Sequence, residues 1–231
     1  MSTRIKKDHK MTTEKPLMPR KLPSQKRAKK TVDTILEAAA QVFTELGYAA
    51  CTTNKIAERA GISIGSLYQY FPNKDAIIVS LTEKMFRDGL DIMEGLVEDM
   101  DDMQITRRQI PRRFIEGMVA MHMKNPKLHK LLVNHAPDLH SISKKAWDSE
   151  KEFSNILVKM LGKEPNLRVK NLSLAAPFIV LLTDAVCHWL IQLSIQNLAD
   201  DKNPASHKKQ QIGVTQIIDE MEDVLLRYLF H

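Results

Sequence analysis

The fold is decided by the stretch Thr52–Lys74, which reads TTNKIAERAGISIGSLYQYFPNK. Its first half predicts a short helix, because either threonine at its start can cap the first turn through a side-chain oxygen. Three apolar residues then recur on one helical face: Ile56, Ala57 and Ala60. Gly61 follows where the chain must turn, and glycine adopts a positive φ angle without steric cost.

A second helix is expected directly after this turn. Ser63 is a suitable N-cap, and Leu67 and Phe71, four residues apart, share the face that points inward. Pro72 ends the helix because it lacks the amide hydrogen that another turn requires, and Asn73 can cap the next element. The side chains left on the other faces are Ser66, Tyr68, Gln69 and Tyr70.

Two short helices joined by a tight turn form a helix-turn-helix, whose second helix fits the major groove of DNA. Small side chains at Ser63, Gly65 and Ser66 would let the backbone approach the base edges. The same pattern is compatible with an ordinary helical hairpin whose tyrosines only pack. Spacing alone therefore leaves both interpretations open.

The preceding residues 35–47, ILEAAAQVFTELG, extend the pattern. Together with Thr-Thr, Ile-Ala, Ala-Gly, Gly-Ser-Leu-Tyr, Tyr-Phe and Asn-Lys in order, they resemble the DNA-binding domain of the TetR (tetracycline repressor) family of bacterial transcription regulators. The resemblance covers roughly residues 31–80, about a fifth of the chain. It implies an all-α fold, with an N-terminal three-helix helix-turn-helix domain and a C-terminal helical domain for ligand binding and dimerisation.

The resemblance also implies a set of DNA-contacting residues: Thr53, Asn54, Ser63, Ile64, Gly65, Ser66, Tyr68, Gln69, Tyr70 and Lys74. We predict that Gln69 and Ser66 read bases, since a side-chain amide can pair bidentately with adenine. Phosphate contacts, which position the protein without specifying sequence, are predicted for Thr53, Tyr68, Tyr70 and Lys74. Some family members have bulkier residues at the position of Gly65, which leaves a base contact there open.

The net charge of +6 is concentrated at the N-terminus. Residues 1–30 contain 11 Lys and Arg against 2 Asp and Glu, whereas the rest of the chain is nearly neutral. We expect residues 1–30 to be a disordered arm, which either lies along DNA phosphates or only keeps the protein soluble. The helix-turn-helix domain is then predicted at 31–76, and the ligand-binding and dimerisation domain at 77–231.

Helical periodicity continues through the second domain. Helices are predicted at residues 31–46, 74–99, 105–124, 127–135, 143–161, 167–197 and 209–230. The helix at 74–99 begins inside the DNA-binding unit and ends in the second domain, so it would connect the two mechanically. The apolar stretch Leu172–Ile195 is long enough to span a bilayer, but it contains Pro177 and Asp184. We therefore expect a core or interface helix, no membrane contact and a cytoplasmic, nucleoid-associated bacterial protein.

The chain lacks the sequence signatures of catalysis and cofactor binding. It contains no phosphate-binding loop, dinucleotide turn or serine elbow, so we predict no enzyme activity and no cofactor. The histidines at 122, 129, 135 and 140 are spaced by seven, six and five, which places no pair on one helical face at the three- or four-residue spacing of metal ligands. We interpret them as packing or surface residues and predict no metal site.

The second domain is rich in methionine, whose flexible thioether can line an adaptable pocket or fill a core. The family resemblance favours a pocket for an apolar or amphipathic small molecule. Its predicted lining is Met93, Phe114, Met118, Met121, Trp147, Phe178 and Trp189. The last helix has a wide apolar stripe that could serve a core and a partner together, and its predicted dimer contacts are Ile217, Met221, Val224 and Tyr228.

We therefore predict a DNA-binding transcription regulator, a repressor that binds a palindromic operator as a homodimer and is released by a small ligand. A helix-turn-helix regulator without a small ligand, constitutive or controlled by a protein partner, is the main alternative. An enzyme that keeps a vestigial DNA-binding fold is a third class, and the missing catalytic motifs argue against it.

Overall fold

The computed structural model describes residues 26–102, 106–135, 140–162, 164–200 and 213–231. These residues are almost entirely helical, and the only β-type pairing among them is an isolated bridge between Leu167 and Phe230. The all-α prediction is confirmed. In chain order the elements are α1 (Lys26–Ala50), α2 (Thr53–Arg59), α3 (Ile64–Tyr70), α4 (Lys74–Asp102), the short 3₁₀ helix η1 (Arg107–Gln109), α5 (Ile110–Met123), α6 (Pro126–His135), α7 (His140–Leu161), α8 (Leu172–Asp200) and α9 (Val214–Leu229).

The helix-turn-helix is formed through the caps that the sequence predicts. The side chains of Thr52, Ser63 and Asn73 each accept a hydrogen bond from the amide three residues further on, at 3.3, 3.1 and 2.8 Å. These caps start α2, α3 and α4. Gly61 has a φ of 65° at the turn, as predicted, so a residue with a side chain would be strained there.

Helix α1 begins five residues earlier than expected. Residues 26–30, KRAKK, continue the helix rather than belonging to the arm, because Lys, Arg and Ala are good helix formers. The predicted break at Gly47 is confirmed by a φ of 73°, although helical turns resume as far as Ala50. The remainder of the predicted arm, residues 1–25, lies outside the described residues.

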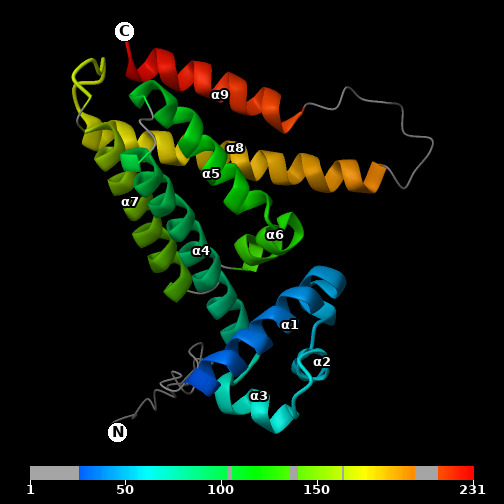
Figure 1. The fold of residues 1–231 in the computed structure, drawn as a ribbon. Coiled ribbons are helices and arrows are strands. Elements are labelled where there is room, and N and C mark those ends of the chain that lie inside the picture. The colour runs from blue at the N-terminus through cyan, green and yellow to red at the C-terminus, as the bar shows by residue number, and fades with distance from the viewer. Residues whose placement is uncertain (1–25, 103–105, 136–139, 163, 201–212) are drawn as a thin grey trace, which may run out of the picture.

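Two hydrophobic cores are arranged along α4 (Figure 1). The first joins α1, α2 and α3 to the first two turns of α4, and it extends past the predicted domain boundary to Leu81. Leu132 of α6 completes this core, although it comes from the second part of the chain. The second core joins the remainder of α4 to α5, α7, α8 and α9. Helices α4 and α6 are therefore the physical links between the two cores.

Helix α4 is 29 residues long, about 43 Å at about 1.5 Å per residue. Its close contact with α5 and α7 depends on Gly89. A methyl group added at Gly89 would lie 2.1 Å from Sδ of Met121 and 3.3 Å from Cζ of Phe153. By contrast, a methyl group at Gly95 would meet nothing within 4 Å. A side chain at Gly89 would therefore force the Met121 side chain to move.

Helix α8 begins at Leu172 rather than Leu167, because the Asn171 side chain accepts the amide of Leu174 at 3.1 Å and caps it there. One side of α8 is buried against α5 and α7. The opposite side exposes a row of large apolar residues that we call the outer α8 stripe: Leu174, Phe178, Leu181 and Trp189. By length and composition alone α8 could cross a membrane, but its packing is that of the predicted core or interface helix.

The C-terminal helix α9 lies alongside α8 at the end of the molecule remote from α2 and α3 (Figure 1). Arg112 of α5 holds it in place through ion pairs with Asp219 at 2.9 Å and Glu222 at 2.6 Å. The predicted start of this helix at residue 209 lies in residues 201–212, outside the described part of the chain.

Candidate nucleic-acid interface and ligand pocket

Helix α3 turns its polar side to solvent. Leu67 and Phe71 are fully buried in the first core, as predicted. The exposed residues of this segment are Ser63, Ile64, Gly65, Tyr68 and Gln69, and the half-buried ones are Ser66 and Tyr70. The helix therefore presents one continuous face with hydroxyl and amide groups, which is the arrangement that insertion into a DNA groove requires. The individual DNA contacts remain predictions.

Two of the predicted phosphate ligands lie side by side. The hydroxyl oxygens of Thr53 and Tyr68 are 3.0 Å apart, which links the start of α2 to the middle of α3. One of these hydroxyls donates to the other, so the pair in this arrangement has one O–H group left to donate to a phosphate oxygen. Asn54 is exposed beside Thr53 at the same end of α2.

Ser63 and Ser66 form a second hydroxyl pair, with their Oγ atoms 2.8 Å apart. Ser63 is already engaged as the cap of α3, and this contact turns the Ser66 hydroxyl toward the cap. Gln69 lies one turn further along, exposed, with an amide that can both donate and accept. Of the two predicted base readers, Gln69 therefore has the freer side chain.

Lys74 is held within the protein. Its Nζ donates to the carbonyl oxygen of Tyr48 at 2.8 Å and that of Cys51 at 3.4 Å, and it lies 3.9 Å from the centre of the Tyr48 ring. The Tyr48 hydroxyl in turn donates to the Asp75 carboxylate. These contacts tie the end of α1 to the start of α4. A phosphate contact by Lys74 stays a prediction, and its ammonium has a structural role in addition.

An exposed ion pair that sequence reasoning missed joins α2 to α1. Arg59 donates through both terminal nitrogens to Glu45, at 2.9 and 2.7 Å, and also to Gln41 at 3.2 Å. The hydrogen bond from Arg59 lowers the pKa of Glu45. The residues are 14 apart and on different helices, so no local pattern in the sequence reveals the pair.

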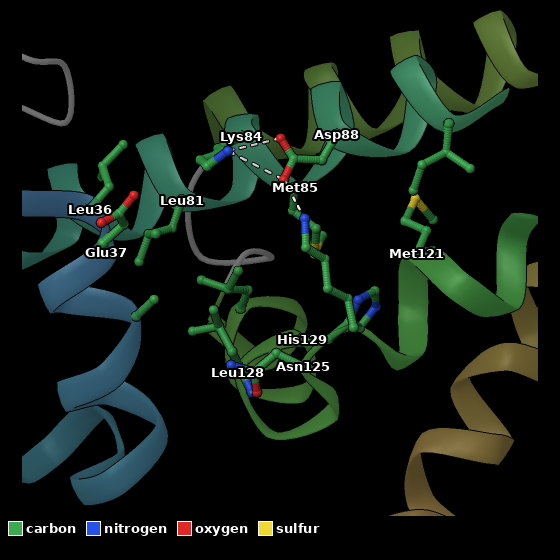
Figure 2. Close-up of a pocket in the computed structure, with 14 residues that line it drawn as sticks. Leu36, Glu37, Leu81, Lys84, Met85, Asp88, Met121, Asn125, Leu128 and His129 are labelled. Carbon is green, nitrogen blue, oxygen red and sulfur yellow. Dashed lines mark hydrogen bonds and ion pairs between the residues drawn. The ribbon is translucent and has the colours of Figure 1, made fainter. Parts of the chain in front are cut away.

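A pocket of about 470 Å³ lies where the two cores meet (Figure 2). Its walls come from α1, α4, the end of α5, and α6, and they are mostly apolar. The lining residues are Leu36, Glu37, Ala40, Leu81, Lys84, Met85, Asp88, Ile92, Met121, Lys124, Asn125, Leu128, His129 and Leu132. We call this the junction pocket. Its size is in the range of small-molecule sites in proteins.

The polar side of the junction pocket carries two cations around one anion. Asp88 accepts from Lys84 at 2.9 Å and from Lys124 at 3.1 Å (Figure 2). Burial tends to raise the pKa of Asp88, but the hydrogen bonds from the two lysines lower it below its usual value. Lys84, Asp88 and Lys124 together have one net positive charge next to apolar walls, and Glu37 on the α1 wall brings the formal charge of the pocket lining to zero.

The predicted pocket residues are distributed over three locations. Met93, Phe114 and Met118 lie inside the second core, and only Met121 lines the junction pocket. Phe178 and Trp189 are exposed on the outer α8 stripe, and Trp189 also borders a smaller pocket of about 310 Å³. Trp147 lies in α7, and its side chain is outside the described set. Helical periodicity identified apolar residues but could not distinguish a filled core, a pocket wall and an outer face.

The predicted dimer residues of α9 are likewise divided. Ile217 and Met221 are 7% and 8% exposed and belong to the second core, so they support the protomer itself. Val224 is 52% exposed, and the half-buried Tyr228 ring packs on Phe178 with ring centres 5.8 Å apart. Val224, Tyr228 and the outer α8 stripe together form an apolar surface on α8 and α9.

Three of the chain's histidines converge although their sequence spacing did not suggest it. His122, His129 and His188 come from α5, α6 and α8, and one nitrogen of each lies within 4.8 Å of the others. Burial and the two neighbouring histidines lower the pKa of His129 to about 3, so its ring is neutral at neutral pH. The three- or four-residue spacing of histidines reveals two metal ligands on one helix, but it cannot reveal a site assembled from three helices.

The residues that form most of the first core match a known protein family. The sequence profile of the bacterial regulatory proteins of the tetR family matches residues 35–81. The uncharacterized HTH-type transcriptional regulator YerO of Bacillus subtilis (strain 168) is 25% identical over 158 residues, which are 64% of this chain and 53% of YerO. The fatty acid metabolism regulator protein of the same strain is 35% identical over 65 residues, 28% of this chain and 34% of that protein. The chain thus spans about half or less of these relatives.

A solved structure extends the similarity to the whole fold. The transcriptional regulator FadR from Bacillus subtilis, in complex with stearoyl-CoA, aligns with a TM-score of 0.60 and 20% sequence identity. The alignment covers 85% of this chain and 98% of that one. At this identity the likeness shows the fold: an N-terminal helix-turn-helix followed by a C-terminal helical domain.

Proposed function

Because the chain belongs to the TetR family of bacterial DNA-binding transcription regulators, we propose that it is a cytoplasmic repressor that binds a palindromic operator as a homodimer and releases it when a small amphipathic molecule binds. The observation that carries this proposal is the position of the junction pocket. Its walls include α1 of the DNA-binding unit as well as α4, α5 and α6. An occupant would therefore contact both cores at once.

Helix α6 provides the mechanical link. On one side Leu132 fills the first core, and the His135 ring stacks on Tyr48 with centres 4.1 Å apart. Asn125, just before α6, donates to the Thr44 hydroxyl at 3.3 Å. On the other side α6 packs on α8. A ligand that prefers a different spacing of α4 and α6 would move α1, and it can shift the equilibrium only by its difference in affinity for the two states.

The chemistry of the junction pocket favours an anionic amphiphile. Apolar walls suit a hydrocarbon chain, and Lys84 and Lys124 around a single Asp88 suit a carboxylate or phosphate group. The FadR neighbour was solved with stearoyl-CoA, which combines such a chain with an anionic head. We therefore take long-chain acyl-CoA as the first ligand class to test.

The apolar surface of α8 and α9 supports the homodimer. Leu174, Phe178, Leu181 and Val224 are each at least half exposed in the protomer. Large exposed apolar side chains gathered on two neighbouring helices of a soluble protein mark an interaction site. A twofold pairing there would place two α3 helices on one face, with half-sites about one DNA turn (about 34–36 Å) or a multiple apart.

The proposal is tested by letting the purified protein select fragments of genomic DNA, which are then sequenced and footprinted. We expect enrichment of short palindromes whose half-sites are protected together. A Gln69→Ala variant should select a relaxed sequence at one position of each half-site, and Gln196→Ala, an exposed glutamine on α8, serves as the matched control. Selection of DNA without any common sequence would contradict the proposal.

A further inference from the structure

A polar cluster lies between α5, α6 and α8, next to the junction pocket, which its member His129 also lines. His122 and His129 are buried and His188 is half-buried, and their nearest ring nitrogens are within 4.8 Å of one another. Asp184, one turn before His188, adds a carboxylate. Its Oδ1 lies 3.0 Å from Nε2 of His122 and its Oδ2 lies 3.5 Å from Nδ1 of His188.

The hydrogen bonds of His122 leave a position for a cation. Its Nδ1 is 2.8 Å from the carbonyl oxygen of Met118, which can only accept, so this nitrogen carries the proton. In the neutral ring Nε2 then has a lone pair, and that lone pair faces the carboxylate of Asp184. Two acceptors at this distance require a proton or a metal ion between them. An imidazole oriented by a backbone carbonyl is also the usual state of a metal-binding histidine.

The second pair of rings is close enough to share either one hydrogen bond or one metal ion. Nε2 of His129 is 3.2 Å from Nε2 of His188, and Nδ1 of His129 is buried without a hydrogen-bond partner within the described structure. Tetrahedral zinc with Zn–N bonds of about 2.0–2.1 Å separates its ligand atoms by about 3.3 Å. The 3.2 Å between these two nitrogens and the 3.0 Å from His122 to Asp184 are close to that value.

An ion could reach this cluster from the surface. A pocket of about 310 Å³ is lined by His129, His188 and Trp189 on the α6–α8 side. His129 also lines the junction pocket, so the cluster lies between two cavities. Any group bound at these histidines would tie α6 to α5 and α8.

We propose that His122, His129 and His188, with the carboxylate of Asp184, form a binding site for one divalent transition-metal ion of the zinc class. Three imidazoles and one carboxylate suit Zn²⁺, Ni²⁺ or Cu²⁺, whereas Mg²⁺ and Ca²⁺ prefer all-oxygen sites. The ligands come from three helices, one of which, α6, also contributes to the first core. Metal binding would therefore restrain the helix that links the two cores.

The test uses the full-length protein freed of metal with a chelator, without DNA or organic ligand. Zn²⁺ is titrated in competition with a chromogenic chelator, and Co²⁺ is added separately to record the visible absorption bands of a tetrahedral site. We expect one equivalent of tightly bound metal, a raised thermal midpoint with Zn²⁺, and no effect of Mg²⁺.

His188→Gln and Asp184→Asn change half-buried positions and are the main variants, with His122→Gln as a third. Each should weaken Zn²⁺ binding by at least about 10–100-fold, the loss that even indirect metal partners cause. The matched control is His135→Gln, on α6 but outside the cluster, which should bind like the wild type. Absence of stoichiometric Zn²⁺ uptake, or equal affinity in the cluster variants and the control, would overturn the proposal and leave a proton-linked histidine–aspartate cluster. Neither result bears on operator binding, which is measured separately.

Discussion

Leu181 provides the sharpest test of the dimer surface, because it lies in the middle of the outer α8 stripe and is 62% exposed in the protomer. Full burial of a leucine side chain contributes about 1.5–3 kcal/mol, so covering the remaining exposed part would contribute about 1–2 kcal/mol. A twofold interface contains the residue twice. Leu181→Glu should therefore lose about 2–4 kcal/mol of dimerisation free energy, about 30- to 1,000-fold in dissociation constant, before the cost of burying two carboxylates is added.

The assay is sedimentation velocity over a range of protein concentrations, combined with thermal unfolding monitored by circular dichroism. Leu181→Glu should be monomeric, with helical content and protomer packing retained, because the residue is exposed in the protomer. Ile217→Glu is the contrasting variant: it places a charge in the second core and should unfold that core. The reasoning is refuted if Leu181→Glu dimerises with wild-type affinity, or if it unfolds as Ile217→Glu does.

Three further predictions concern the DNA-binding unit and α4. Tyr68→Phe should weaken operator binding by one phosphate contact on all sequences, whereas Gln69→Ala should reduce discrimination at one base pair by about 1–3 kcal/mol; equal losses on every sequence in a binding assay would invalidate these roles. Lys74→Met should lower the free energy of unfolding by about 1.5–3 kcal/mol, because charge-assisted hydrogen bonds to two carbonyl groups are lost. Unchanged stability in urea together with a smaller salt slope of DNA affinity would instead make Lys74 a phosphate ligand. Gly89→Ala should destabilise by about 1–3 kcal/mol through its clash with Met121, while Gly95→Ala should be neutral or slightly stabilising; equal unfolding midpoints would show that Gly89 has no packing role.

The sequence was sufficient to predict the elements whose causes are local. Thr52, Ser63 and Asn73 cap the helices they precede, and Gly61 takes the positive φ expected of it. A cap or a turn depends on residues within one helical turn, so the order of side chains determines it directly. The inward positions of Leu67 and Phe71 follow in the same way from helical periodicity.

Features that depend on contacts between distant segments could not be predicted in this way. The junction pocket combines α1 with α4 and α6, and the histidine cluster combines three helices; neither has a signature within a single helix. Helix α8 is apolar on both its core side and its outer side, so its pattern did not show that Phe178 and Trp189 face outward. Lys74 illustrates a related limit, since the sequence could not show that its ammonium is engaged by the carbonyls of Tyr48 and Cys51.

The central claim is that a ligand in the junction pocket controls DNA binding. The most direct test is to titrate stearoyl-CoA into a complex of the protein with its selected operator and to measure operator release by the fluorescence anisotropy of labelled operator DNA. We predict that stearoyl-CoA weakens operator affinity, and that the operator weakens stearoyl-CoA affinity by the same factor, as linkage requires. Lys124→Ala, which removes a cation from the pocket, should need more ligand for release. Lys127→Ala, an exposed lysine on α6 outside the pocket, should respond like the wild type. Operator affinity independent of stearoyl-CoA, or equal shifts in the two lysine variants, would contradict the account.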